Sequence, residues 1–286
     1  MIALFFRELA GCICVLCIGL IEKCPASVSV FFLQGLLPMY MLIRWSHIQT
    51  VRTRILVSPF SGQISIWSYY HRRLSMLIQM IKAHRQKGTS FASRIQGEKY
   101  FREAIHSQKP VLLCGLHMGL FELLHRVPFE AGKGIFKDFT LITAPAFSKI
   151  VTAYMIKGRL AKGKSVVFNS DLSRAVKKTI RQKGVLAVML DQYPSPTHKH
   201  FYLWGQLRMR YNPKLLDLFE KAGGHIIPVS TWITHSGESV VNYHPALNRK
   251  GGDWGAAIRQ FIERQVQKAP AQWNWSYPAL KIMPEE

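Results

Sequence analysis

Hydrophobic and polar positions along the chain alternate in blocks that predict strands and helices in turn. Apolar runs predict buried strands at 111–117, 139–144, 165–169, 185–191, 225–233 and 240–244. Apolar residues that return every three or four positions predict helices at 64–87, 97–106, 148–160, 171–183, 214–222 and 254–268. Because strands and helices alternate, we expect an α/β fold with a mostly parallel central sheet flanked by helices.

Two apolar blocks, 9–21 and 25–43, precede this pattern and are separated by Glu22, Lys23 and Cys24. A helix that crosses a bilayer needs ~20 apolar residues, so the first block is short and the second is nearly long enough. Ten Lys or Arg residues but a single acidic residue, Glu98, lie between positions 44 and 99. This charge bias predicts a membrane anchor at 1–45 and one large cytoplasmic domain at 46–286. The alternative is a buried hydrophobic hairpin in a soluble protein.

The overall charge narrows the choice of partner. Lys and Arg outnumber Asp and Glu by 38 to 16, which gives a formal net charge of +22 and indicates an anionic partner. No finger of paired Cys and His, basic heptad region or Arg/Gly aromatic repeat is present, so the sequence argues against nucleic acid. The apolar N-terminus favours an anionic membrane instead. Five cysteines, four of them in or beside the N-terminal blocks, suggest no disulfide framework.

The predicted strand at 111–117 ends at a histidine and continues into Met118 and Gly119. If a helix starts near Gly119, Glu122 falls in its first turn, where its carboxylate can lie near the His117 ring. A carboxylate on one ring nitrogen fixes the tautomer and leaves the other nitrogen to accept a proton. The corner therefore suggests a general base with its partner. The alternative is a structural histidine at a strand end.

A second polar residue lies at a comparable position. Asp191 closes the predicted strand at 185–191, and ligand sites in α/β sheets lie at the carboxyl ends of strands. The chain has no dinucleotide-binding glycine motif, phosphate-binding loop, nucleophilic serine elbow or His-Glu-x-x-His motif. These observations favour chemistry without a nucleotide, a covalent serine or a metal.

Four segments carry a resemblance to a known family. His117-Met118-Gly119-Leu120-Phe121-Glu122 matches the His-x-x-x-x-Asp/Glu motif of membrane glycerolipid acyltransferases. The remainder resembles the bacterial lipid A late (secondary) acyltransferase family, including lauroyl- and myristoyl-transferring members. Gly158-Arg159-Leu160 is similar to its Gly-Arg segment, 184–192 to its Gly-strand-Asp-Gln block, and 269–275 to its Ala-Pro-Glu-Gln-Trp-x-Trp signature. The similarity covers about residues 100–280.

The resemblance implies a role for each matched residue. His117 would be the catalytic general base and Glu122 the residue that orients it. Arg159 would bind a substrate phosphate or the developing oxyanion, and Asp191 would position that arginine or the acceptor. Trp273 and Trp275 are interpreted as packing residues. No cofactor is implied, because an acyl thioester on acyl carrier protein or coenzyme A is a co-substrate.

The resemblance also implies a setting: the bacterial inner membrane, with the catalytic domain on its cytoplasmic face. The expected reaction moves an acyl chain to a hydroxyl of a lipid A precursor or a similar anionic lipid. The terminal signature departs from the family, because Ala271 replaces an acid and Ser276-Tyr277 stand where His-Arg follow. A lysophospholipid, amino-acid lipid or glycolipid acceptor is therefore an alternative. A non-catalytic basic membrane-binding protein is the alternative from another functional class.

Overall fold

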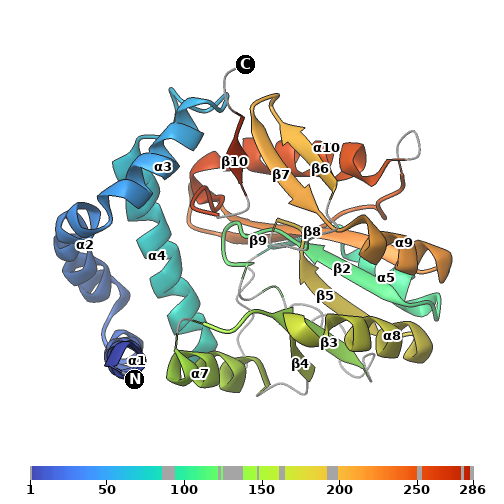
Figure 1. Ribbon diagram of the computed structural model, residues 1–286, viewed down its shortest axis with the longest axis horizontal. Helices are drawn as coiled ribbons and strands as arrows, with labels where there is room; N and C mark the ends of the chain where they lie inside the picture. The colour runs from blue at the N-terminus through green and yellow to red at the C-terminus, as the bar shows by residue number, and fades with distance from the viewer. Residues whose placement is uncertain are drawn as a thin grey trace.

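A seven-stranded sheet forms the centre of the molecule in the computed structural model (Figure 1). The strand order is β1-β9-β8-β2-β5-β3-β4, and every neighbouring pair is parallel except β8 and β9. The strands are β1 (Arg94–Gln96), β2 (Val111–Gly115), β3 (Phe139–Thr143), β4 (Ser165–Phe168), β5 (Val185–Met189), β8 (His225–Ile233) and β9 (Ser239–Tyr243). The structure describes residues 2–85, 94–121, 124, 138–146, 148–160, 165–191, 199–249, 253–277 and 280–283.

Helices cover the sheet, and the predicted α/β class is confirmed. The helices are α4 (Ile66–Arg85), α5 (Glu98–His106), α7 (Lys149–Leu160), α8 (Leu172–Gln182), α9 (Pro213–Lys221) and α10 (Trp254–Lys268). Each lies within two residues of a helix predicted from apolar periodicity. The reason is visible in α9, where Asn212 accepts a hydrogen bond from the Leu215 amide and caps a helix that buries Leu216 and Phe219.

A three-stranded antiparallel sheet, β10-β7-β6, was not predicted. It contains β6 (Lys199–Leu203), β7 (Leu207–Tyr211) and β10 (Lys281–Ile282). The signal for β7 is present in the sequence, because buried Leu207, Met209 and Tyr211 alternate with arginines. The turn between β6 and β7 uses positive φ at Trp204 (49°) and Gly205 (78°). A tryptophan is an uncommon residue for this conformation, so the usual hairpin signature is missing.

The two N-terminal blocks lie in two helices, α1 (Ile2–Lys23) and α2 (Ala26–Ile43), and a third helix, α3 (Trp45–Leu56), follows them. Among the described residues, no single helix is both long and apolar enough to cross a bilayer. Ser27–Ile43 and Trp45–Leu56 meet that requirement only together, across a bend of 94°. The anchor at 1–45 and the domain at 46–286 therefore stay predictions.

Hydrogen bonds of two glutamates in α1, and of a lysine in α4, connect α1 to the rest of the protein. The Glu8 carboxylate accepts hydrogen bonds from the Lys149 amide, at the start of α7 (3.1 Å). The Tyr154 hydroxyl, also on α7, donates to Glu22. Lys82 of α4 donates to the carbonyl oxygens of Ile21 (3.0 Å) and Cys24 at the end of α1. These contacts satisfy polar groups that interrupt an otherwise apolar helix.

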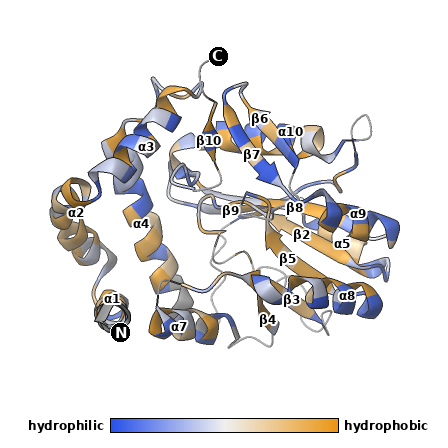
Figure 2. Cartoon of the chain, in the orientation of Figure 1, coloured by the Kyte–Doolittle hydropathy of each residue, from blue (hydrophilic) through white to orange (hydrophobic). Residues whose placement is uncertain are grey.

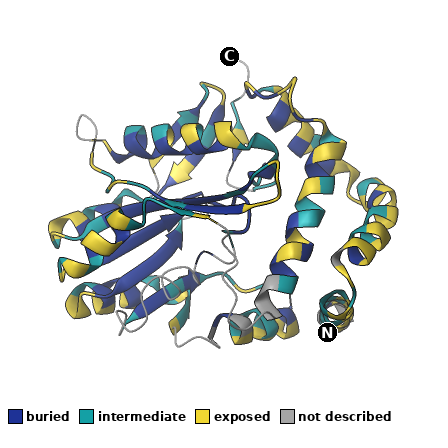
Figure 3. Cartoon of the chain, turned by 180° about the vertical axis from the view of Figure 1, so that it is seen from behind, coloured by how far each residue is buried: buried dark blue, intermediate teal, exposed yellow. Residues whose placement is uncertain are grey.

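The outer surface of α1 and α2 is strongly apolar. Figure 2 shows hydrophobic residues over α2, and Figure 3 shows that much of this surface is exposed. On α1, Leu16 and Leu20 are 69% and 63% exposed. Phe31 and Phe32 are 75% and 67% exposed, and Leu42 and Ile43 at the end of α2 are 74% and 73% exposed. Soluble proteins rarely expose contiguous apolar surface of this kind, which marks an interaction site.

A buried arginine joins α3 to the end of the chain. Arg54 donates hydrogen bonds from Nη1 to the carbonyl oxygens of Trp275 and Tyr277, each at 2.8 Å. Its side chain is buried, and this desolvation lowers the pKa of the guanidinium. Position 54 follows Ile48 and Val51 at helical spacing, so it lies on the buried face of α3.

We expect Arg54→Met to destabilise the protein, because two buried carbonyl groups lose their donor. An unsatisfied buried acceptor costs about 1–3 kcal/mol, and the hydrophobic replacement recovers part of the cost of burying a charge. Urea unfolding followed by tryptophan fluorescence measures this loss. Exposed Arg52→Met on the same helix is the control and should leave the midpoint unchanged. Equal midpoints for the two variants would contradict the prediction.

We expect protonation of the partly buried His244 to destabilise the protein in acid. Burial, with a smaller effect from Lys268, lowers the pKa of His244 to about 4. Its Nε2 lies 3.1 Å from the Ser230 hydroxyl, which donates in turn to Gln265 (3.1 Å). Because unfolded histidine titrates near 6.5, the unfolded state binds more protons between pH 6.5 and about 4. The contribution of His244 to the free energy of unfolding is therefore fully present above pH 6.5 and is lost as the pH falls from 6.5 to about 4.

The expected loss in the free energy of unfolding is roughly 3 kcal/mol across the window. His244→Gln should remove that part of the pH dependence, whereas His106→Gln at an exposed position should retain it. Denaturant unfolding at pH 4, 5, 6 and 7 measures both. An unchanged slope in the His244→Gln protein would show that other groups cause the acid sensitivity.

Candidate active site

The register of two neighbouring strands brings His117 and Asp191 together. β2 and β5 are parallel, and Gly115 at the end of β2 pairs with Met189 at the end of β5. The Leu190 amide then donates to the Gly115 carbonyl oxygen at 2.8 Å. His117 and Asp191 each lie two residues beyond these paired ends. Both side chains therefore leave the sheet at the same edge, which is where the sequence predicts a site.

Asp191 accepts hydrogen bonds from three N–H groups. Its Oδ1 lies 2.7 Å from His117 Nδ1, and its Oδ2 accepts from the His117 backbone amide at 3.0 Å. The Trp273 indole Nε1 donates to Oδ2 at 3.1 Å. The carboxylate is 1% exposed and the imidazole 6%. An ionised carboxylate has no proton to donate, so Nδ1 carries the hydrogen and Nε2 is the nitrogen that can accept a proton.

The chain turns sharply after His117. Gly119 has φ 57°, and a side chain there would meet the Thr231 carbonyl oxygen of β8 at 2.6 Å. Thr231 also donates from its hydroxyl to the Met118 carbonyl oxygen at 2.6 Å, and Met118 forms an isolated bridge with Trp273. Glycine is thus required by both the backbone conformation and the close approach. The predicted helix after this corner falls mostly outside the described residues.

Two aromatic rings hold the imidazole from its sides. Phe121 lies edge-on to His117 with ring centroids 4.6 Å apart. The Tyr277 ring is stacked against His117 at 5.5 Å and 20°. Because Arg54 binds the Tyr277 carbonyl oxygen, the ring position depends on a contact with α3. The imidazole is therefore restrained in orientation as well as in tautomer.

Arg159 enters the same region from α7. It is 7% exposed, and its Nη1 donates to the hydroxyl of Thr143, the last residue of β3. Since β3 is parallel to β5, Thr143 lies at the same sheet edge as Asp191. The predicted Gly-Arg segment thus places a buried guanidinium beside the carboxyl ends of the central strands. A planar fork of donors in such a position can bind a carboxylate, a phosphate or an oxyanion.

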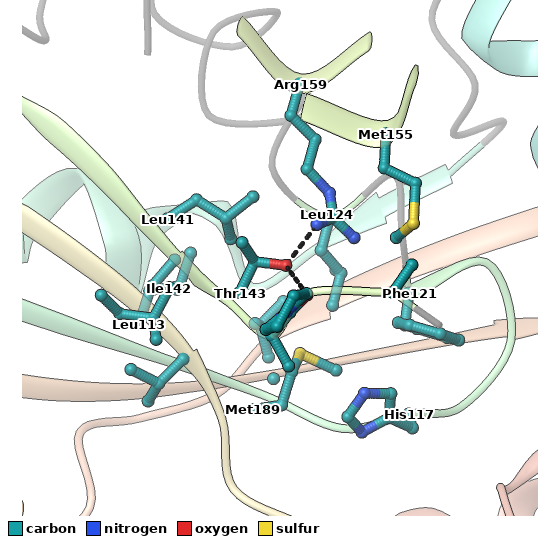
Figure 4. Close-up of a pocket in the computed structure, with 17 residues that line it drawn as sticks. Leu113, His117, Phe121, Leu124, Leu141, Ile142, Thr143, Met155, Arg159 and Met189 are labelled. Carbon is teal, nitrogen blue, oxygen red and sulfur yellow. Dashed lines mark hydrogen bonds between the residues drawn. The ribbon is translucent and has the colours of Figure 1, made fainter. Parts of the chain in front are cut away.

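An apolar cavity of about 270 Å³ lies between His117 and Arg159 (Figure 4). His117 and Arg159 both line it, and Figure 4 shows Arg159 reaching from its helix toward Thr143. Most of the wall is hydrophobic, formed by Leu113, Phe121, Leu124, Leu141, Ile142, Met155 and Val229. A cavity with an apolar wall and a few convergent polar groups is the usual form of a small-molecule site. Its chemistry suits a hydrocarbon chain that ends in a polar reacting group.

The predicted site residues differ in how far the structure describes them. His117, Arg159 and Asp191 all lie at the sheet edge, and Asp191 contacts the histidine, whereas the sequence suggested a role with the arginine or the acceptor. Glu122, the predicted partner of His117, lies outside the described residues. Among the described residues, no group of three His, Cys, Asp or Glu side chains could hold a metal ion.

Sequence reasoning missed two polar contacts of the site. Trp273 is fully buried, as the packing interpretation predicts, but it also donates to Asp191. Thr143 holds Arg159, and its position at the end of a predicted strand was the available signal. No pattern in the sequence shows that Trp273 reaches Asp191, because this contact joins positions that are 82 residues apart.

Comparison with known proteins identifies the family. Residues 50–281 match the family model described as bacterial lipid A biosynthesis acyltransferase. The match runs from within α3 to β10 and includes His117, Arg159, Asp191 and Trp273. Comparison with curated proteins gives no match. Since the family model covers most of the sequence, the chain belongs to the bacterial lipid A biosynthesis acyltransferase family and is an acyltransferase.

Proposed function

We propose that this enzyme transfers an acyl chain from a thioester donor, acyl carrier protein or coenzyme A, to a hydroxyl of a lipid A precursor or a similar anionic lipid. The observation that carries the proposal is the buried His117–Asp191 pair, 2.7 Å apart, on the wall of an apolar cavity. An alcohol is a weak nucleophile at neutral pH. A base that removes its proton during attack accelerates such a reaction by roughly 10²–10⁴.

In the proposed reaction, His117 Nε2 takes the proton of the acceptor hydroxyl while its oxygen attacks the thioester carbonyl carbon. The carbon–sulfur bond then breaks, and the imidazolium returns the proton to the leaving thiolate. The products are an ester and a free thiol. Asp191 stabilises the imidazolium and holds its tautomer, as a buried carboxylate does in other base-assisted acyl transfers. No acyl-enzyme is needed.

The cavity beneath this pair would hold the donor's acyl chain. Its hydrophobic wall excludes water from the thioester, which favours transfer over hydrolysis. Arg159 lies in that wall with its guanidinium fixed by Thr143. We assign it to the developing oxyanion or to a phosphate of a substrate, because each presents oxygen acceptors to a planar donor fork.

The membrane location is part of the proposal. The exposed apolar surface of α1 and α2 supports attachment to a bilayer, where the acceptor lipid resides. The net charge of +22 suits an anionic membrane surface and acidic partners. We propose the cytoplasmic face of the bacterial inner membrane, as the distribution of basic residues predicts.

Substitution of the carboxylate tests the mechanism. We expect Asp191→Asn to lower kcat by about 10²–10⁴, because an amide can impose the wrong tautomer on His117 and cannot stabilise the imidazolium. Trp273→Phe, which removes one donor to Asp191 and keeps the ring, should cost about 10-fold. Steady-state transfer from acyl carrier protein measures both, with circular dichroism as the control for folding.

Glu122→Gln completes this comparison, since the sequence motif assigns the orienting role to Glu122. A loss smaller than that of Asp191→Asn would agree with orientation by Asp191. Full activity of Asp191→Asn together with an inactive Glu122→Gln would overturn the assignment and restore the pair predicted from the motif.

Lipid profiling tests the reaction and its acceptor. Cells that express the chain should contain a lipid heavier by one acyl group than the corresponding lipid in cells that lack it. The shift should disappear with His117→Gln, which keeps the approximate size of the side chain but removes the base. Mass spectrometry of the lipid extract identifies the acceptor as a lipid A precursor, a lysophospholipid, an amino-acid lipid or a glycolipid. A shift that persists in the His117→Gln cells would refute the general-base mechanism.

A further inference from the structure

A second apolar space lies between α2 and α4. It is a groove of about 530 Å³, formed on one side by leucines of α2 and on the other by α4 residues such as Leu77 and Met80. The groove is larger than the active-site cavity. Nothing in the proposed mechanism described above uses it.

Phe121 forms a wall shared by the groove and the active-site cavity. Its ring lies edge-on to His117 on the cavity side, with centroids 4.6 Å apart. It also packs against a small cluster that contains Met76 and Met80 of α4. The groove therefore ends at a ring that contacts His117, on the side of the N-terminal helices.

The groove also carries polar and cationic groups. His47, Arg73 and the Tyr70 ring line it, and none of its described lining residues is acidic. The Tyr70 hydroxyl is buried and has no hydrogen-bond partner among the described residues. Burial raises the pKa of Tyr70, and the charges of Arg73 and Arg44 act in the opposite direction. A buried hydroxyl donor that lines the same groove as the cationic Arg73 fits an anionic oxygen of a ligand.

The surface next to the groove indicates where such a ligand comes from. Leu36 lines the groove and is 53% exposed, and Phe31, Phe32 and Leu42 on the same helix are more exposed still. Figures 2 and 3 show this apolar, exposed surface along α2. A lipid can pass from an apolar phase along this surface into the groove without exposing its chain to water.

We propose that the α2–α4 groove binds the acceptor lipid, with an acyl chain between the two helices and a phosphate at Arg73 and Tyr70. The inference rests on the proposed function and adds a site for the second substrate. Donor chain and acceptor then reach His117 from opposite sides of Phe121. This arrangement keeps two hydrocarbon chains apart while their reacting ends meet at one base.

Photolabelling tests the site without turnover. The probe is phosphatidic acid with a diazirine at the end of one acyl chain, presented to full-length His117→Ala protein in phosphatidylcholine vesicles. We expect adducts on groove residues, at Leu37, Leu77 or Met80. Adducts confined to the outer face of α2, at Phe31, Phe32 or Leu42, would overturn the proposal.

Matched variants separate the groove from the general apolar surface. Leu36→Trp places an indole on the groove wall and should lower groove labelling about 10-fold, because the indole occupies space that the acyl chain of the probe needs. Leu42→Trp on the same helix lies outside the groove and should label like the parent protein. Equal labelling of the two variants would contradict the assignment.

The phosphate contact has its own comparison. A fatty acid with the same diazirine offers a carboxylate, so the parent protein should prefer the phosphatidic acid probe by about 5-fold through charge-assisted hydrogen bonds. Arg73→Gln should abolish this preference. Inorganic phosphate should not compete with the lipid probe, because it lacks the acyl chain that the groove holds. A preference that survives Arg73→Gln would refute the headgroup site.

The outcomes also distinguish this inference from the proposed function. If the groove is labelled but the unaltered protein, with His117 in place, shows no transferase activity, the proposed reaction is refuted and the lipid site is supported. Transfer to a lipid acceptor without groove labelling would refute the groove alone.

Discussion

A carboxylate buried at the edge of the central sheet sets the geometry of the whole site. Asp191 has almost no access to water, so its charge has to be compensated by protein donors. It receives the backbone and ring N–H groups of His117 and the indole N–H of Trp273. These donors come from the end of β2 and from the C-terminal segment, and the carboxylate itself follows β5. Three parts of the chain are thereby fixed around one charge.

The C-terminal segment extends this constraint to the N-terminal helices. The rings of Trp273 and Trp275 are fully buried, with centroids 4.8 Å apart. Arg54 of α3 binds the carbonyl oxygens of Trp275 and Tyr277, and Tyr277 stacks on His117. A displacement of α3 would therefore move the Tyr277 ring and change the packing of the His117 imidazole. This link connects α3 to His117 through the C-terminal segment.

The proposed chemistry needs two different spaces, and Phe121 lies between them. Acyl transfer needs a dry space for the donor chain and access for an acceptor that resides in a bilayer. The small cavity under Arg159 meets the first demand, and the wider groove beside exposed α2 meets the second. Phe121 touches the base and both spaces. The arrangement explains why a single aromatic ring sits between the two apolar compartments.

The sequence by itself determined the order of six of the seven central strands and of the helices between them, whereas β1 (Arg94–Gln96) was not predicted. Buried parallel strands and amphipathic helices leave strong periodic signals, so α10 is predicted at 254–268, where the structure has it. The motif at 117–122, the segments that contain Arg159 and Asp191, and the segment 269–275 also indicated the family, which the match over residues 50–281 confirms. The β6–β7 hairpin was not predicted, because its turn has a tryptophan at positive φ instead of the usual turn residues. The alternation of apolar and basic residues in β7 is nevertheless present in the sequence.

Tertiary structure alone decided which side chains meet. The β2–β5 register puts His117 level with Asp191, although 74 residues separate them, and the fold brings Trp273 to the same carboxylate. Burial of Arg54 and the position of Phe121 between two apolar spaces are likewise products of packing. Local periodicity records only which face of an element is buried. Contacts between distant elements depend on strand register and helix packing, which no short stretch of sequence encodes.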